Sequence, residues 1–152
     1  MGGRMTAAFI FFNLLLVDQL VKYYVDMTML PGESIPVLPG VFHITYVLNP
    51  GAAFGIFQNQ QWLFLVVSAA FCIVFLRFYT RLSRSGALLH YGSVLLASGA
   101  VSNMIDRVRT GHVVDFCDFR IWPVFNIADI AIVFGVLCLL WALFVQKREL
   151  LS

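Results

Sequence analysis

Residues 99–132 read GAVSNMIDRVRTGHVVDFCDFRIWPVFNIADIAI, and this stretch decides how the rest of the chain is interpreted. It places half of the protein's 8 acidic residues between or just inside two long apolar segments. These residues are Asp106, Asp115, Asp118 and Asp129. A carboxylate at the edge of hydrocarbon costs free energy unless it is paired, protonated or solvated. We therefore expect a functional site here and interpret Asp115 and Asp129 as an acid/base pair.

The composition predicts a membrane protein. Of 152 residues, 61% are hydrophobic and 12% are charged, and the mean hydropathy is +0.88. Soluble domains usually carry about twice this charged fraction. We expect one integral membrane domain over residues 1–152. Because no basic run is interleaved with aromatic residues, we expect no nucleic-acid partner.

Four apolar runs are each long enough to cross a bilayer as a helix, which takes about 20 residues. They cover approximately 6–25, 62–80, 87–105 and 127–146. The loop after the second run is rich in arginine, whereas residues 26–61 contain no Lys or Arg. By the positive-inside rule, both termini lie in the cytoplasm, and residues 26–61 and 106–125 form outer loops. The basic residues that set this orientation are Arg4, Arg77, Arg81, Arg84, Lys147 and Arg148.

The two outer loops contain residues suited to strands. Residues 41–47, VFHITYV, are rich in β-branched and aromatic side chains, which predicts a short strand or hairpin on the membrane surface. Residues 113–119, VVDFCDF, alternate in part between apolar and polar side chains and could add to that strand. In such a strand, alternation would turn Asp115 away from Val114 and Phe116.

Several polar residues have both a structural and a functional interpretation. Asp18 and Lys22 lie one helical turn apart, so they could form a simple ion pair, support a polar site between helices, or do both. Asn126 and Asp129 fit a capping pattern, with Asn126 at the N-cap. Capping alone does not explain why an apolar span follows Asp129 immediately. Asn49 belongs to an Asn-Pro-Gly turn that could also bring backbone close to a substrate.

A pair of neighbouring carboxylates can act as acid and base without a cofactor. Two such groups cannot easily both ionise, so one keeps a proton while the other accepts one from water. We assign the base to the pair and not to either residue alone. The cysteines and histidines show no spaced ligand pattern, so we expect no metal and no cofactor.

Five motifs in order along nearly the whole chain resemble lipoprotein signal peptidase, the type II signal peptidase of bacteria. They are Asp18-Gln-Leu-Val-Lys22, Asn49-Pro-Gly-Ala-Ala-Phe54, Gly99-Ala-Val-Ser-Asn-Met-Ile-Asp-Arg107, Gly111-His-Val-Val-Asp-Phe116 and Phe125-Asn-Ile-Ala-Asp129. The resemblance implies an all-α membrane protein with four transmembrane helices and a small extracytoplasmic β-sheet that cradles the substrate.

The resemblance also implies an activity and a set of site residues. It implies an aspartic endopeptidase of the bacterial plasma membrane that cleaves diacylglyceryl-modified prolipoproteins just before the lipidated cysteine and is inhibited by globomycin. Its partners would be these substrates and membrane lipids, and we expect a monomer. Asp115 and Asp129 match the catalytic aspartates. Site-shaping positions match Asn103, Asp106, Arg107, Asn126 and Ala128; substrate-loop positions match Asn49 and Gly51; a supporting pair matches Asp18 and Lys22.

One residue departs from the family pattern, and two other functions compete with the peptidase. Ser102 stands where glycine is common, which predicts a slightly looser helix contact there. A proton-coupled transporter could use the same carboxylates, but it would need ionisable groups along a pathway, and spans two and three are nearly free of them. A structural membrane subunit would tolerate carboxylate-to-amide changes.

Overall fold

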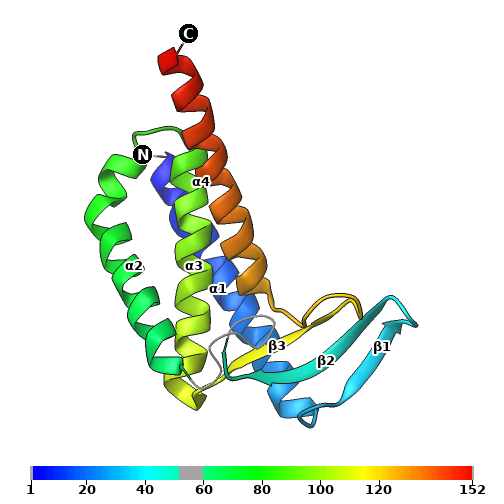
Figure 1. Ribbon diagram of the computed structural model, residues 1–152. Helices are drawn as coiled ribbons and strands as arrows, with labels where there is room; N and C mark the ends of the chain where they lie inside the picture. Colours follow the sequence, from blue (N-terminus) through cyan, green and yellow to red (C-terminus); the bar gives the residue numbers. More distant parts are fainter. Residues whose placement is uncertain (1, 52–59, 152) are drawn as a thin grey trace.

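The computed structural model describes residues 2–51 and 60–151 and contains four helices and three strands in these parts of the chain. The helices are α1 (Gly2–Thr28), α2 (Gln61–Leu82), α3 (Ala87–Thr110) and α4 (Ile127–Leu151), and the strands are β1 (Ser34–Leu38), β2 (Phe42–Asn49) and β3 (Val113–Asp118). The motif residues Ala52, Ala53 and Phe54 lie outside the described residues. All four helices are long and apolar enough to cross a membrane, which confirms the predicted class. Figure 1 shows them side by side, with the sheet at one end.

Helix α3 lies at the centre of the bundle and packs against each of the other three helices. Its buried residues are mostly small, including Gly92, Ala97 and Gly99. A Cβ atom added to Gly92 would lie 2.7 Å from Cβ of Cys138, and one added to Gly135 would lie 2.7 Å from the Gly92 carbonyl oxygen. Small residues therefore allow the α3 and α4 backbones to approach closely, as is common between membrane helices.

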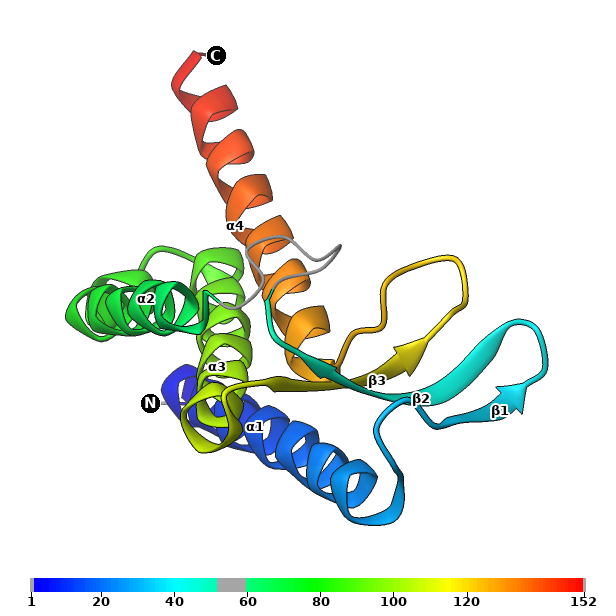
Figure 2. The same cartoon turned by 60° about the horizontal axis from the view of Figure 1, so that its bottom comes forward.

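The three strands form one antiparallel sheet in the order β1-β2-β3. The predicted strand at 41–47 corresponds to β2, and the predicted extended segment at 113–119 corresponds to β3, which pairs with it. Val47 is opposite Asp115, and Asn49 is opposite Val113. Figure 2 shows the sheet extending to one side of the helices. The sequence predicted either a single strand or a hairpin in this part of the chain, and β1 pairs with β2 to form a hairpin.

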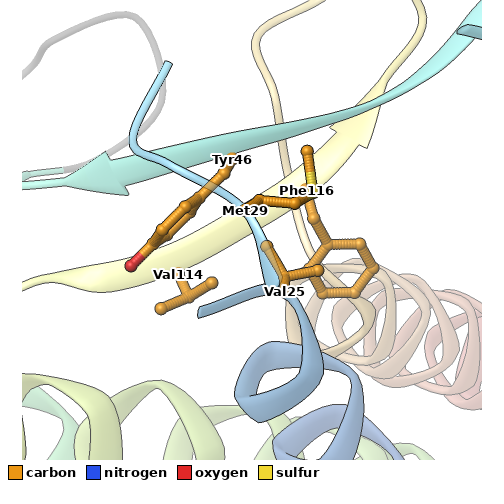
Figure 3. Packing of buried hydrophobic residues seen from close by; sticks show 5 residues of the cluster. All are labelled: Val25, Met29, Tyr46, Val114 and Phe116. Carbon is orange, nitrogen blue, oxygen red and sulfur yellow. The ribbon is translucent and has the colours of Figure 1, made fainter. Parts of the chain in front are cut away.

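An apolar cluster fixes the sheet to the end of α1. Val114 and Phe116 of β3 pack with Tyr46 of β2 against Val25 of α1 and against Met29, the residue that follows the helix (Figure 3). Because side chains alternate along a strand, the residue between Val114 and Phe116 faces the other way. The predicted alternation is confirmed, and this cluster positions Asp115.

The polar end of α3 was wrongly predicted as loop. The helix continues to Thr110 and ends at Gly111, whose φ of 75° is left-handed and whose N–H donates to the Arg107 carbonyl over 3.0 Å. Glycine adopts this conformation without a steric penalty, so it ends the helix there. Asp106, Arg107 and Arg109 are consequently helical. The apolar run ends at residue 105, and hydropathy alone does not show that the helix continues through the polar residues that follow.

Candidate active site

Asn126 joins the two aspartates predicted to form the acid/base pair. Its side-chain amide donates to Oδ1 of Asp115 over 2.6 Å, and its backbone N–H donates to Oδ2 of Asp129 over 3.2 Å. Asp115 is 1% exposed in the middle of β3, whereas Asp129 is half-buried in the first turn of α4. The sheet and the bundle thus each supply one carboxylate to the same hydrogen-bond network.

The capping interpretation of Asn126 and Asp129 is confirmed. The Asp129 N–H donates to Asn126 Oδ1 over 2.9 Å, so Asn126 caps α4 while Asp129 caps Asn126 in return. This reciprocal cap uses only part of each side chain. The amide nitrogen of Asn126 points to Asp115, and the second carboxylate oxygen of Asp129 accepts from Asn103 over 2.7 Å. Capping and a shared polar site therefore coexist.

The orientation of the Asn103 amide follows from its neighbours. Its oxygen accepts from Lys22 Nζ over 2.8 Å and from the Asn126 amide over 3.2 Å. Both partners are donors, so the Asn103 oxygen must face them and its own nitrogen faces Asp129. A path of hydrogen bonds therefore connects a cation in α1 to Asp129 in α4.

Lys22 is buried between two carboxylates. Its ammonium lies 2.7 Å from Asp18 Oδ2 and 2.7 Å from Asp106 Oδ2, and the Lys22 side chain is 3% exposed. Desolvating such charges costs free energy that only close pairing and hydrogen bonds offset. The ion pair predicted with Asp18 is present, and Lys22 also reaches Asn103. Lys22 therefore makes the simple ion pair and also contacts the polar residues between the helices.

Asp18 ties α1 to the beginning of α4. Its Oδ1 accepts from the Ala128 N–H over 2.9 Å, so a residue far away in sequence satisfies a free donor at the α4 N-terminus. Ser102 donates to Asp18 Oδ2 over 2.6 Å and accepts from Gln19 over 3.0 Å. Ser102 is 0% exposed, so its hydroxyl connects the helices at the position where a looser contact was predicted.

Gln19 is a site residue that the sequence analysis missed. Its amide donates to Asp106 Oδ1 over 2.7 Å and to the Ser102 carbonyl over 3.2 Å. A single uncharged amide in an apolar run carries no sequence signal by itself. The available signal was its spacing, because Gln19 precedes Lys22 by three residues and so shares its helix face.

The last residue of β2, Asn49, contacts Asp115 from the other side. Asn49 donates to Asp115 Oδ2 over 2.8 Å, and its own oxygen accepts from the Gly51 N–H over 2.9 Å. Arg107 donates to the Gly51 carbonyl over 3.3 Å, and its guanidinium carbon lies 4.7 Å from the centre of the Phe64 ring. The turn predicted at Asn49 therefore exists and also places an amide on the Asp115 carboxylate.

The two aspartates of β3 lie in opposite electrostatic environments. Burial, followed by the negative charge of Asp129, raises the pKa of Asp115 to about 7, although amide hydrogen bonds and Lys22 act in the opposite direction. Burial also acts to raise the pKa of Asp118, but hydrogen bonds from Thr45 and Arg120 outweigh it and lower that pKa. Asp115 can therefore hold a proton near neutral pH, which a carboxyl does only in a special environment.

The site contains two carboxylates held by amides, Asp115 and Asp129, and a buried ammonium, Lys22, that is paired with two further carboxylates. Within residues 2–51 and 60–151, no group of three His, Cys, Asp or Glu side chains is arranged to bind a metal ion. A carboxyl that keeps a proton beside a carboxylate that has lost one can donate and accept protons in one reaction. All the predicted site residues meet at the end of the bundle that carries the sheet, which Figure 1 shows at its lower end.

Comparison with known proteins gives consistent results. Residues 10–145 match the family model described as signal peptidase (SPase) II. The chain is 48% identical to a lipoprotein signal peptidase of Moorella thermoacetica, over 89% of this chain and 90% of that protein. It is 51% identical to one of Pelotomaculum thermopropionicum, over 85% of each chain. A bacterial membrane enzyme solved by the in meso method at 2.3 Å resolution superimposes with a TM-score of 0.89 at 34% identity, over 95% of this chain and 90% of that one.

Proposed function

The chain belongs to the signal peptidase II family and is a membrane peptidase that acts as a lipoprotein signal peptidase, and from that premise we propose that it is an aspartic endopeptidase. In this proposal Asp115 and Asp129 are the catalytic residues. The substrate is a prolipoprotein whose cysteine already carries diacylglycerol, and the bond cut lies just before that cysteine. The reaction needs no cofactor.

One observation carries the proposal: Asn126 donates to both Asp115 and Asp129, at 2.6 Å and 3.2 Å. Asparagine side chains and backbone amides around both carboxylates satisfy some of their oxygens without neutralising them. The raised pKa of Asp115, about 7, supports a division of roles in which Asp115 holds the proton and Asp129 is ionised. A structural ion pair would need a cation in contact with each carboxylate instead.

The reaction then proceeds with two proton transfers. Asp129 accepts a proton from a water molecule while the water oxygen attacks the scissile carbonyl carbon. Asp115 donates its proton toward the carbonyl oxygen, which stabilises the tetrahedral intermediate. When the C–N bond breaks, Asp129 gives the proton that it took from water to the leaving amine, which becomes the new N-terminus of the lipoprotein. As the intermediate collapses, one of its hydroxyl protons returns to Asp115. The signal peptide leaves with the carboxyl group, and the pair again shares one proton.

We infer that the site faces the outer leaflet of the bacterial plasma membrane and that both termini lie in the cytoplasm. The arginines at 77, 81 and 84 support this orientation through the positive-inside rule. A signal peptide is an apolar helix whose cleavage site lies near the outer interface. Water reaches that depth most easily beside polar helix ends, such as those of α1 and α3.

The decisive experiment is cleavage of a defined substrate. The purified protein is incubated with a diacylglyceryl prolipoprotein, with and without globomycin, and the products are identified by mass. We expect a product that begins with the lipidated cysteine, and we expect globomycin to prevent its formation. Cleavage at another bond, or of the unlipidated precursor at the same rate, would contradict the proposed specificity.

A further inference from the structure

A basic pocket lies at the end of the bundle opposite the sheet. It has a volume of about 270 Å³ and is lined by Gly3 and Arg4 of α1, Ser83 and Arg84 after α2, and His90 of α3. The Arg4 guanidinium donates to the Ser83 hydroxyl over 3.5 Å. None of the five lining residues is acidic. Two arginines on one pocket repel each other, so a bound anion would be stabilised there.

A second, apolar cavity of about 270 Å³ is formed by the same three helices. Its lining includes Ala8 and Phe12 of α1, Phe75 and Tyr79 of α2, and Val94 of α3. The lining offers almost no polar surface. Such a cavity suits an alkyl chain, because the apolar surface of the chain would lie against apolar side chains and away from polar groups.

The two cavities follow one another along the helices. Tyr79 of the apolar cavity lies one turn before Ser83 of the basic pocket, and Val94 lies one turn after His90. His90 Nε2 and the Tyr79 hydroxyl are 3.4 Å apart, so one residue of each cavity is in contact with the other. The basic pocket and the apolar cavity are therefore neighbours along α1, α2 and α3, and we call the two together the groove.

We propose that this groove binds one anionic phospholipid, with its phosphate at Arg4 and Arg84 and an acyl chain between α1, α2 and α3. Basic pockets between transmembrane helices are suited to phosphate headgroups. A lipid fits better than a free phosphate because an apolar cavity of about 270 Å³ lies next to the anion site. A cationic peptide segment would be repelled by the same two arginines. The site is remote from Asp115 and does not depend on the catalytic assignment.

The proposal is tested by lipid binding to the intact, delipidated protein in a non-ionic detergent. Native mass spectrometry counts bound molecules during titration with phosphatidylglycerol, with phosphatidylcholine of the same chains, and with glycerol 3-phosphate. We expect one phosphatidylglycerol to be retained and to raise the melting temperature, and little retention of the other two. Equal binding of phosphatidylcholine, or full competition by glycerol 3-phosphate, would overturn the assignment to an anionic lipid.

Matched charge variants distinguish binding in this pocket from nonspecific attraction of an anionic lipid to surface arginines. Arg4→Gln with Arg84→Gln removes two charges from the pocket, whereas Arg77→Gln with Arg81→Gln removes two exposed charges near the same end but outside it. At the energy typical of one basic residue near an anionic surface, the first pair should weaken phosphatidylglycerol binding roughly thirtyfold. The second pair should have a much smaller effect. Equal losses in both pairs would overturn the proposal.

A third variant tests the apolar cavity. Ala8→Phe fills part of it from an exposed position on α1 and leaves both arginines in place. We expect phosphatidylglycerol binding to weaken while the melting temperature of the lipid-free protein stays close to that of the wild type. Undiminished binding by Ala8→Phe would show that no acyl chain enters the cavity, and the proposal would fail.

Discussion

Gly99 of α3 lies against the backbone of Ala128 in the first turn of α4, so closely that an added Cβ would overlap the Ala128 carbonyl oxygen. The same Cβ would lie 2.8 Å from Cγ1 of Ile132. Real Cβ atoms essentially never come as close to another atom as this Cβ would come to the Ala128 oxygen and to Cγ1 of Ile132. This contact fixes the distance between Asn103, one turn after Gly99, and Asp129, the residue after Ala128.

We therefore predict that Gly99→Ala disrupts both stability and cleavage. The added methyl group must push α4 away from α3, at a cost of about 1–3 kcal/mol for overpacking. Thermal unfolding in detergent and a cleavage assay measure the two effects. Gly2→Ala is the matched control, because nothing lies within 4 Å of a Cβ at that position. Normal activity in Gly99→Ala would show that the helix contact does not set the site geometry.

Asp115→Asn and Asp129→Asn should each abolish cleavage of the lipidated substrate. Removing a general acid or base typically costs about 100- to 10,000-fold in rate. Because the amide keeps the size of the carboxyl group, insertion and the melting temperature should change little. Asp118→Asn is the control, since Asp118 lies on the same strand but bonds to Thr45 and Arg120 instead. Retained cleavage in either catalytic variant would remove the proposed mechanism.

Activity should fall on the alkaline side of the pH profile. With its pKa raised to about 7 by burial and by Asp129, Asp115 loses the shared proton as the pH rises through that value. The dianionic pair then lacks a proton donor. The measurement is kcat/KM against pH, and a profile that stays flat up to about pH 9 would contradict the role of Asp115.

The raised pKa of Asp115 also determines whether the folded protein becomes more or less stable as the pH rises. A carboxyl whose pKa is higher in the folded state holds its proton more tightly there, so its contribution is complete below its unfolded pKa and is lost as the pH rises through about 7. The melting temperature should therefore decrease over this range in the wild-type protein. The decrease should be smaller in Asp115→Asn, which does not titrate.

Asn126→Ser separates capping from the bridge between the carboxylates. Serine is also a good N-cap and can accept from the Asp129 N–H, so α4 should remain stable. It cannot donate an amide to Asp115, which Asn126 does over 2.6 Å. We expect a melting temperature close to that of the wild type and a strongly reduced kcat. Full activity would mean that Asn126 serves only as a cap.

Lys22→Met should strongly destabilise the protein. It leaves Asp18 and Asp106 buried without their shared cation, and breaking such a pair from one side costs about 3–5 kcal/mol. Adding Asp106→Asn removes one of the unpaired charges and should recover part of the loss. Thermal unfolding of both single variants and the double variant measures the coupling. Additive losses would show that Lys22 and Asp106 do not act together.

Much of the fold could be predicted because its signals are local. The four spans follow from apolar length, and the strands follow from β-branched content and alternation, which correctly turned Asp115 away from Val114 and Phe116. The cap formed by Asn126 also needed only its own sequence neighbours. The end of α3 was wrong because polar residues at a helix tip resemble a loop when only hydropathy is read.

The sequence by itself determined the class, the four spans, the strands β2 and β3, and the family, because hydropathy, periodicity and motif order are properties of neighbouring residues. Only the tertiary structure decided which polar groups meet. Asp18 accepts from Ala128, 110 residues away, and Lys22 reaches Asp106 as well as Asp18. Gln19 and Ser102 belong to this network, although a single amide and a single hydroxyl in apolar segments do not predict which groups they contact. The physical reason is that helix packing sets these contacts, and small residues such as Gly99 let the helices come close enough to make them.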